Sequence, residues 1–276
     1  MIRADNLVSS VTLVFVVALG RPANAQLRPL EPIPWRLFEA SNNLAGEVGG
    51  SRMFDQKASL AGTSGTLTEV ANFSLAFRTG RVVLEAAGTA ERFFHDQSRF
   101  ANPYPDVKPA TNNDRRDAGD YRISTVLRLT PDLFPFVGVL RFGTRLPTTD
   151  NTTGLDRDAT DFFVTVGASS QRGPVFIGAE SGLGIHGTRE PRFEQDDLFL
   201  YGLRAELRKG LFVPTASLIG QLHGNDHNAI RGVENLGEAR IGIRAGELTW
   251  IRIEALKGYT KFSPSSGILL TAGIVR

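Results

Sequence analysis

The chain lacks cysteine and is poor in the other residue types that most often carry chemistry. Its 276 residues include no cysteine, four histidines, two methionines and two tryptophans. Without cysteine the protein can form neither disulfides nor thiolate metal sites. The formal net charge is only +2, from 31 basic and 29 acidic side chains, so no basic excess indicates nucleic acid as a partner.

A segment long enough for a transmembrane helix is also missing. The N-terminal apolar run Leu7–Leu19 has roughly 13 residues, whereas a spanning helix needs about 20. Arg3 precedes this run, and Ala23-Asn24-Ala25 forms a small-x-small site after it, which is the pattern of a cleaved secretory signal. We therefore predict a signal peptide at 1–25, a periplasmic N-terminal segment at 26–43 and one domain at 44–276.

Alternation with period two runs through most of that domain. One stretch, for example, alternates between apolar Ala239, Ile241 and Ile243 and charged Arg240 and Arg244. This period is typical of strands with two different faces. Twelve such segments occur, at about 44–54 (with 35–42 as an alternative first strand), 66–78, 81–94, 118–129, 136–146, 158–169, 174–186, 196–208, 211–224, 234–244, 248–258 and 267–276.

The links between these segments alternate in length. Very short links such as Thr79-Gly80 and Lys209-Gly210 alternate with long polar ones such as Asp55–Gly65 and His95–Asp117. Tight periplasmic turns and long extracellular loops are typical of outer-membrane barrels, and an even strand count returns both termini to the periplasm. We predict an all-β fold, an up-and-down antiparallel transmembrane β-barrel of about 12 strands. A soluble β-sandwich would share the alternation but would not explain why every second link is long.

Aromatic residues gather near the ends of the predicted strands. Amphipathic rings favour the headgroup layer, so two aromatic girdles are expected. The expected girdle residues are Phe93, Phe94, Tyr121, Phe142, Phe162, Phe199 and Tyr201 near the long loops, and Phe77, Phe136 and Phe212 near the short turns.

If the apolar faces meet lipid, the polar faces line the lumen. We expect a lining of nine arginines and six glutamates, which either pair and fill a narrow barrel or surround a pore with a slight anion preference. Arg122, Arg128, Arg141 and Arg145 lie on two adjacent strands and are the best candidates for a ladder facing a ligand. The full expected lining is Glu85, Glu91, Arg122, Arg128, Arg141, Arg145, Glu180, Arg204, Glu206, Arg208, Glu238, Arg240, Arg244, Arg252 and Glu254.

Other candidate sites have weaker signals. His223 and His227 are four residues apart beside Asp226, but in a strand end and a loop they do not form the three- or four-ligand set of a zinc site. The oxygen-rich stretch from Asp150 to Asp161 lacks the spacing of a defined calcium loop. Four histidines, none in a His-x-Ser pairing, give little support for a hydrolase. We therefore expect no catalytic residue, metal or cofactor.

Part of the chain resembles a known family. The stretches Arg141–Asp150, Gly154-Leu155-Asp156 and Asp161–Gly167 resemble a motif in outer-membrane barrels of the transporter-like family associated with the meta-pathway of phenol degradation. The family motif has a basic residue, an apolar residue, Pro-Thr-Gly and an acid, and Thr149 stands here in place of its glycine. The resemblance covers about 45 residues, Arg141 to Gly187, and implies a barrel that helps small, often apolar compounds across; it implies no binding residue.

These observations predict an outer-membrane pore for passive passage of small, apolar or anionic solutes in a Gram-negative-type bacterium, after removal of the signal peptide. The expected partners are outer-membrane lipid, a small-molecule solute and the barrel-assembly machinery. Two alternatives are a non-conducting structural or surface-recognition barrel and a membrane-embedded hydrolase. The loop at His95–Asp117 lies outside the barrel or folds inward as a constriction.

Overall fold

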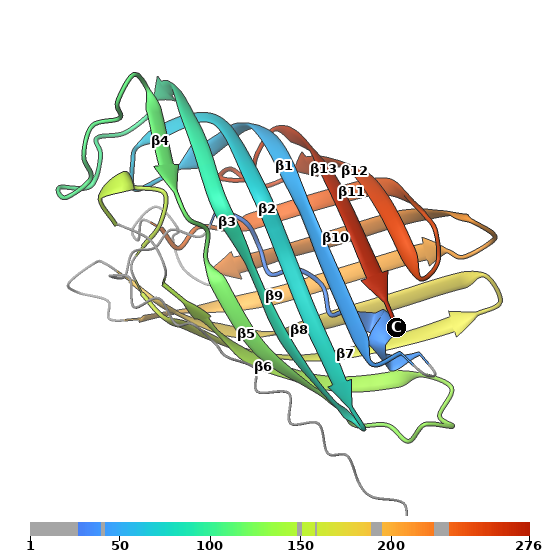
Figure 1. The fold of residues 1–276 in the computed structure, drawn as a ribbon. Helices are drawn as coiled ribbons and strands as arrows, with labels where there is room; N and C mark the ends of the chain where they lie inside the picture. Colours follow the sequence, from blue (N-terminus) through green and yellow to red (C-terminus); the bar gives the residue numbers. More distant parts are fainter. Residues whose placement is uncertain (1–26, 40–41, 148–150, 158, 189–194, 224–231) are drawn as a thin grey trace, which may run out of the picture.

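The strands form one antiparallel sheet that closes on itself (Figure 1). A computed structural model describes the chain except for residues 1–26, 40–41, 148–150, 158, 189–194 and 224–231, so the predicted signal peptide lies outside the described residues. The first strand pairs with the last and also with the second, which closes the wall. The strands are β1 (Leu44–Ala58), β2 (Thr63–Thr79), β3 (Val82–Arg99), β4 (Asp114–Asp117), β5 (Tyr121–Arg128), β6 (Val137–Leu146), β7 (Asp161–Arg172), β8 (Val175–Gly187), β9 (Gln195–Leu207), β10 (Phe212–His223), β11 (Leu236–Ala245), β12 (Thr249–Gly258) and β13 (Ser266–Val275).

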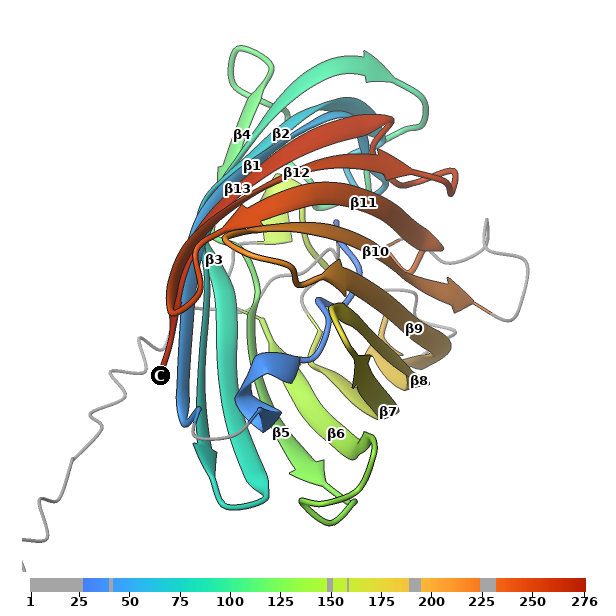
Figure 2. The ribbon, with the colours of Figure 1, turned by 90° about the vertical axis from the view of Figure 1, so that its right-hand side faces the viewer.

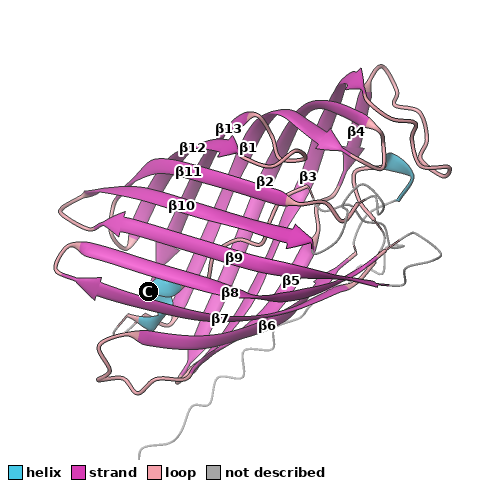
Figure 3. Cartoon of the chain, turned by 180° about the vertical axis from the view of Figure 1, so that it is seen from behind, coloured by secondary structure: helices cyan, strands magenta, loops and turns pink. Residues whose placement is uncertain are grey.

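The wall has twelve strands because β4 and β5 together form one of them. Both pair with β3, β4 at Arg92–His95 and β5 at Val82–Gly88, with an interruption at residues 118–120 between them. The predicted up-and-down antiparallel barrel of twelve strands is confirmed (Figure 3). The alternative first strand at 35–42 is wrong, since Trp35–Phe38 is a 3-10 helix.

Apolar side chains cover the outside of the wall and charged ones the inside. Ile241 is 68% exposed and Ile251 59%, whereas Glu238 and Arg141 on the other face are fully buried. A sandwich would bury the apolar stripes between two sheets. This surface is instead the outward apolar band of an outer-membrane β-barrel. Among the described residues, no helix is long and apolar enough to cross a membrane.

Links of different length lie at the two ends of the wall. One end, here called the turn end, carries the links at 80–81, 129–136, 173–174, 208–211 and 246–248, all of which except 129–136 have two to four residues. The opposite end, the loop end, carries links that include 100–113, 147–160 and 259–265. The first loop is shorter than predicted, because β1 continues to Ala58 and β2 begins at Thr63, leaving only 59–62 between them.

Tyrosine rings cover glycines on two neighbouring pairs of strands near the loop end. A Cβ on Gly220 would lie 2.3 Å from the hydroxyl of Tyr201, and one on Gly237 would lie 2.4 Å from the ring of Tyr259. The two hydroxyls are 2.7 Å apart and hydrogen-bonded. The glycines therefore leave room for the rings to lie against the backbone of β10 and β11. The hydrogen bond between the two hydroxyls then links β9 to the end of β12, across the two strands between them.

A local bulge changes which residues of β3 face inward. Ala71 on β2 has a positive φ of 53° and is the extra residue in the pairing of β2 with β1, between Val70 opposite Gly50 and Asn72 opposite Gly49. Beyond this point Arg92 is buried, while Glu91 pairs with the exposed Arg116 on the outer surface. The inward placement of Glu91 is therefore wrong, because a bulge shifts the alternation by one residue.

The same change of parity moves one girdle residue inward. Phe94 is 1% exposed and packs in a cluster at the loop end, so its predicted girdle position is wrong. The other expected girdle residues except Tyr201 are between 39% and 60% exposed, and these are Phe77, Phe93, Tyr121, Phe136, Phe142, Phe162, Phe199 and Phe212.

Residues 27–39 run through the inside of the barrel (Figure 2). Leu27 packs at the loop end with Met53 and Leu155, and Phe38 packs at the turn end with Val83 and Phe176. Prolines at 29, 32 and 34 keep the segment extended and remove three N–H donors that would need partners in the interior. The sequence predicted a periplasmic position for 26–43; the described residues 27–39 lie within the lumen.

Candidate functional site: a charged lumen around the N-terminal segment

The N-terminal segment is held near the loop end by ion pairs. Arg28 Nη1 lies 3.0 Å from Glu69 Oε2, and Arg28 Nη2 lies 3.3 Å from Glu238 Oε2. Glu31 receives two parallel hydrogen bonds from Arg240, of 2.8 and 2.9 Å. Burial alone would raise the pKa of Glu31, but Arg240 and Arg28 outweigh it and hold that pKa well below its ordinary value. The segment therefore stays ionised and paired.

Arg141 forms the centre of the lumen. Its side chain is fully buried and its Nη2 donates to Glu85 Oε2 at 2.8 Å, while Nη1 lies 3.6 Å from Glu180 Oε2. Nη1 also donates to the carbonyl of Glu31 at 2.9 Å, and Glu180 accepts from the backbone N–H of Ile33 at 3.0 Å. One cation thus joins three strands to the N-terminal segment.

A second group of ion pairs lies beneath the loop end. Arg145 bridges Asp120 at 3.0 Å and Asp161 at 2.7 Å, and Asp161 also pairs with Arg157. Asp156 adjoins this group. Burial and the neighbouring carboxylate of Asp120 raise the pKa of Asp156 well above its ordinary value.

Three links at the loop end contribute side chains to one apolar cluster. Leu60 and Leu155 are fully buried and Val107 is 7% exposed, so the links at 59–62, 100–113 and 147–160 pack against one another. The loop predicted at His95–Asp117 was expected to lie outside the barrel or to fold inward. Its residue Val107 is buried in this cluster, so this part of the loop folds inward. Part of that loop is strand, because β3 continues to Arg99 and β4 pairs with it.

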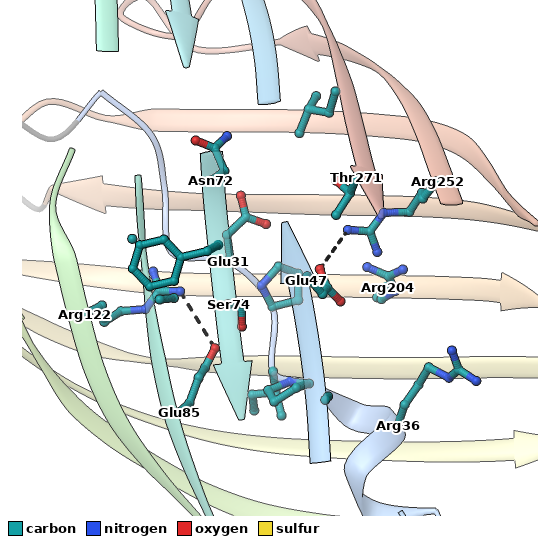
Figure 4. Close-up of a pocket in the computed structure, with 18 of the residues that line it drawn as sticks. Glu31, Arg36, Glu47, Asn72, Ser74, Glu85, Arg122, Arg204, Arg252 and Thr271 are labelled. Atoms are coloured by element: carbon teal, nitrogen blue, oxygen red, sulfur yellow. Dashed lines mark hydrogen bonds and ion pairs between the residues drawn. The ribbon is translucent and has the colours of Figure 1, made fainter. Parts of the chain in front are cut away.

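At the turn end, cations are more numerous than buried carboxylates. Arg204 and Arg208 both donate to Glu206, at 2.7 and 2.8 Å. Arg244 lies farther from Glu206, with 3.7 Å between Nη2 and Oε2. Arg252 lies 3.4 Å from the half-exposed Glu47 (Figure 4).

A cavity of about 230 Å³ follows the N-terminal segment along the lumen. Ten arginines and six carboxylates line it, an excess of four positive charges. Trp35, Trp250, Leu269, Ile274 and Val275 add apolar surface. The space suits a small molecule that carries negative charge and an apolar part.

Of the fifteen residues expected to line the lumen, fourteen face it. Glu91 is the exception described above, and Glu85 and the thirteen residues named at the end of this paragraph lie inside. Arg141, Arg145, Glu238 and Glu254 are at most 7% exposed. Each of the four arginines of the expected ladder has a carboxylate neighbour, and a role of the ladder in facing a ligand stays a prediction. The thirteen are Arg122, Arg128, Arg141, Arg145, Glu180, Arg204, Glu206, Arg208, Glu238, Arg240, Arg244, Arg252 and Glu254.

Sequence reasoning missed the inward charges that come from irregular segments. Arg28 and Glu31 lie in a proline-rich stretch without periodicity, and Asp120 and Asp156 lie between strands. The only sequence signal was that Arg28 and Glu31 stand three apart among prolines in a stretch that also carries Trp35.

The histidines of the described residues have carboxylate neighbours. His95 and Asp114 are joined at 2.7 Å, and His223 pairs with Asp196. No group of three or more metal-ligating side chains occurs among the described residues. His227 of the weak zinc pattern, and Asp150 and Asp158 of the calcium pattern, lie outside those residues.

No family model matches the sequence, and no curated protein matches it either. The resemblance to the phenol meta-pathway family therefore stays a prediction. Solved barrels are similar over most of their length. The CymD monoaromatic hydrocarbon channel is 11% identical with a TM-score of 0.46, covering 94% of each chain.

Two further solved barrels are similar to the chain. The translocator domain of the autotransporter NalP from Neisseria meningitidis is 14% identical with a TM-score of 0.47, covering 87% of this chain and 90% of that one. Outer membrane phospholipase A from Escherichia coli is 12% identical with a TM-score of 0.44, covering 85% and 98%. These three are a channel, a translocator domain and a phospholipase, and they share with this chain the barrel fold alone.

Proposed function

We propose that the protein is an outer-membrane channel for small solutes, closed in this conformation by its own N-terminal segment. The observation that carries the proposal is the position of residues 27–39, which run through the lumen and belong to none of the described strands. Side chains hold them in place, through Arg28, Glu31 and the carbonyl contacts of Arg78 with Leu37 and Glu39. Such contacts can be exchanged without breaking the barrel wall.

The wall beneath the segment supports passage of partly apolar solutes. Val83, Val126 and Val139 face the lumen and are buried against Leu37 and Phe38. Withdrawal of the segment would leave these valines beside the arginines of the turn end. A solute with an apolar body and a negative charge fits that combination of surfaces.

A non-conducting barrel is the second candidate. It is favoured by the ion pairs of Arg141 and Arg145 across the lumen and by the apolar cluster at the loop end. Smaller barrels can be filled by side chains and conduct nothing. Under the channel proposal the protein has no hydrolytic activity, so lipid turnover by the purified barrel would contradict it.

Liposome swelling separates the two candidates. We expect slow swelling with the processed wild type, faster swelling when residues 27–39 are deleted, and the fastest when residues 101–112 of the loop-end link are also replaced by a short Gly-Ser linker. Each variant is first shown to fold by the shift of its gel mobility on heating. If every folded variant swells like empty liposomes, the barrel does not conduct.

A further inference from the structure

The turn end of the lumen has a group of arginines whose hydrogen-bond donors are not all satisfied. We define the turn-end arginine cluster as Arg36 on the N-terminal segment, Arg204 and Arg208 on and after β9, and Arg244 and Arg252 on β11 and β12. All five line the same cavity. Figure 4 shows Arg204 and Arg252 beside Glu47, with Arg36 below them.

Protein carboxylates leave part of this cluster unpaired. Glu206 and Glu254 are the buried partners, and Glu39 and Glu47 have side chains 38% and 36% exposed. The buried atoms Arg36 Nη1, Arg208 Nη2 and Arg244 Nε have no hydrogen-bond partner among the described residues. Arg244 is only 4% exposed, so its Nε is shielded from bulk water.

Unsatisfied buried guanidinium groups are costly, and a bound oxyanion would remove that cost. A buried donor left without a partner keeps its full desolvation penalty, which is larger when the group is charged. Guanidinium is also the side-chain group best matched to a carboxylate. The cluster is therefore arranged for an anion that supplies the missing acceptors.

The surroundings of the cluster add an apolar requirement. The guanidinium carbon of Arg252 lies 5.0 Å from the ring of Trp250, and that of Arg208 lies 4.0 Å from the ring of Phe176. Trp35 lines the same cavity. A ligand whose carboxylate meets Arg244 can thus place an apolar body against these rings.

We infer that the turn-end arginine cluster is a binding site for small organic carboxylates with an apolar body. That this ligand is a transported solute rests on the proposed channel function. Binding at the site does not require that the barrel conducts. Binding without conduction would remove the channel proposal and leave the site. Conduction without binding would remove the site and leave the channel proposal.

Tryptophan fluorescence gives a direct test, because both tryptophans of the chain line the cavity. The processed protein in detergent is titrated with cyclohexanecarboxylate, which does not absorb in the range used. We expect a saturable change in emission, and none with the neutral analogue cyclohexylmethanol. Arg244→Gln should weaken the apparent Kd at least tenfold, and Arg244→Lys should give an intermediate value.

Two further variants keep the test decisive. Arg36→Gln, on the N-terminal segment rather than the wall, should also weaken binding and covers the case in which Arg244→Gln does not fold. Arg172→Gln, at an exposed position of the turn end, should leave binding unchanged. The inference is overturned if cyclohexylmethanol binds equally well, if Arg36→Gln and Arg244→Lys both bind like wild type, or if sulfate binds as tightly as the carboxylate.

Discussion

At the residue scale, Arg141 shows how a charge is tolerated in the interior. It is fully buried, yet two carboxylates and two further oxygen acceptors surround it. Removing one partner of such a pair costs about 3–5 kcal/mol, because the other charges remain buried and uncompensated. Loss of Arg141 would therefore leave the carboxylates of Glu85 and Glu180 buried without this cation.

We predict that Arg141→Met lowers the free energy of unfolding by about 3–5 kcal/mol, since Glu85 and Glu180 lose their shared cation. The measurement is the urea midpoint in detergent micelles. Arg116→Met, in the exposed pair with Glu91, is the matched control and should leave the urea midpoint nearly unchanged, because exposed ion pairs contribute little to stability. Equal effects of the two substitutions would refute the central role of Arg141.

Asp156 predicts a dependence of stability on pH. Its folded pKa is raised, so the folded state binds the proton more tightly than the unfolded chain, whose Asp has a pKa of about 3.9. The free energy of unfolding therefore decreases as the pH rises from about 3.9 through the raised folded pKa, and the Asp156 contribution is constant above it. Asp156→Asn should flatten this part of the curve and be no less stable than wild type at pH 8. An unchanged curve in this variant would show that Asp156 is ionised in the folded state.

At the element scale, the strands were predictable and the N-terminal segment was not. Alternation along 239–244 reports which face meets lipid, and that information is local. The position of residues 27–39 depends on charges of distant strands, such as Glu238 for Arg28 and Arg240 for Glu31. Likewise, nothing in the sequence around Glu91 shows the bulge at Ala71 on the partner strand.

Tryptophan packing predicts how firmly the segment is held. A Cβ on Gly178 would lie 2.6 Å from Trp35 Nε1, so Gly178→Ala should push the ring off the wall. Overpacking costs about 1–3 kcal/mol and should favour release of the segment from the wall. The rate of trypsin cleavage after Arg36 should therefore rise at least about fivefold, and mass spectrometry measures that rate.

Gly46→Ala is the matched control for Gly178→Ala. Its added Cβ would come no closer than 3.6 Å to Ile274, so cleavage should stay at the wild-type rate. Cleavage that rises equally in both variants would mean that Trp35 does not anchor the segment.

At the scale of the whole molecule, the outer surface decides where the protein can be stable. Ile241 faces outward near the middle of β11, and Ile251 faces outward near the turn end. We predict that Ile241→Arg costs about 2–4 kcal/mol in a lipid bilayer and Ile251→Arg about 0–1, because the penalty falls from the midplane to the interface. Urea unfolding in vesicles measures both. A soluble fold would show no such dependence on depth.

The seam between β1 and β13 sets an order of events during biogenesis. The cylinder cannot be sealed until residues 266–275 exist, since they pair with the opening strand. Residues 27–39 emerge first among those described here, yet they are enclosed only when that seam forms. Enclosure of the N-terminal segment is thus coupled to the pairing of β1 with β13, the last step of barrel closure. A protein fused ahead of Leu27 should therefore slow this step more than one fused after Arg276.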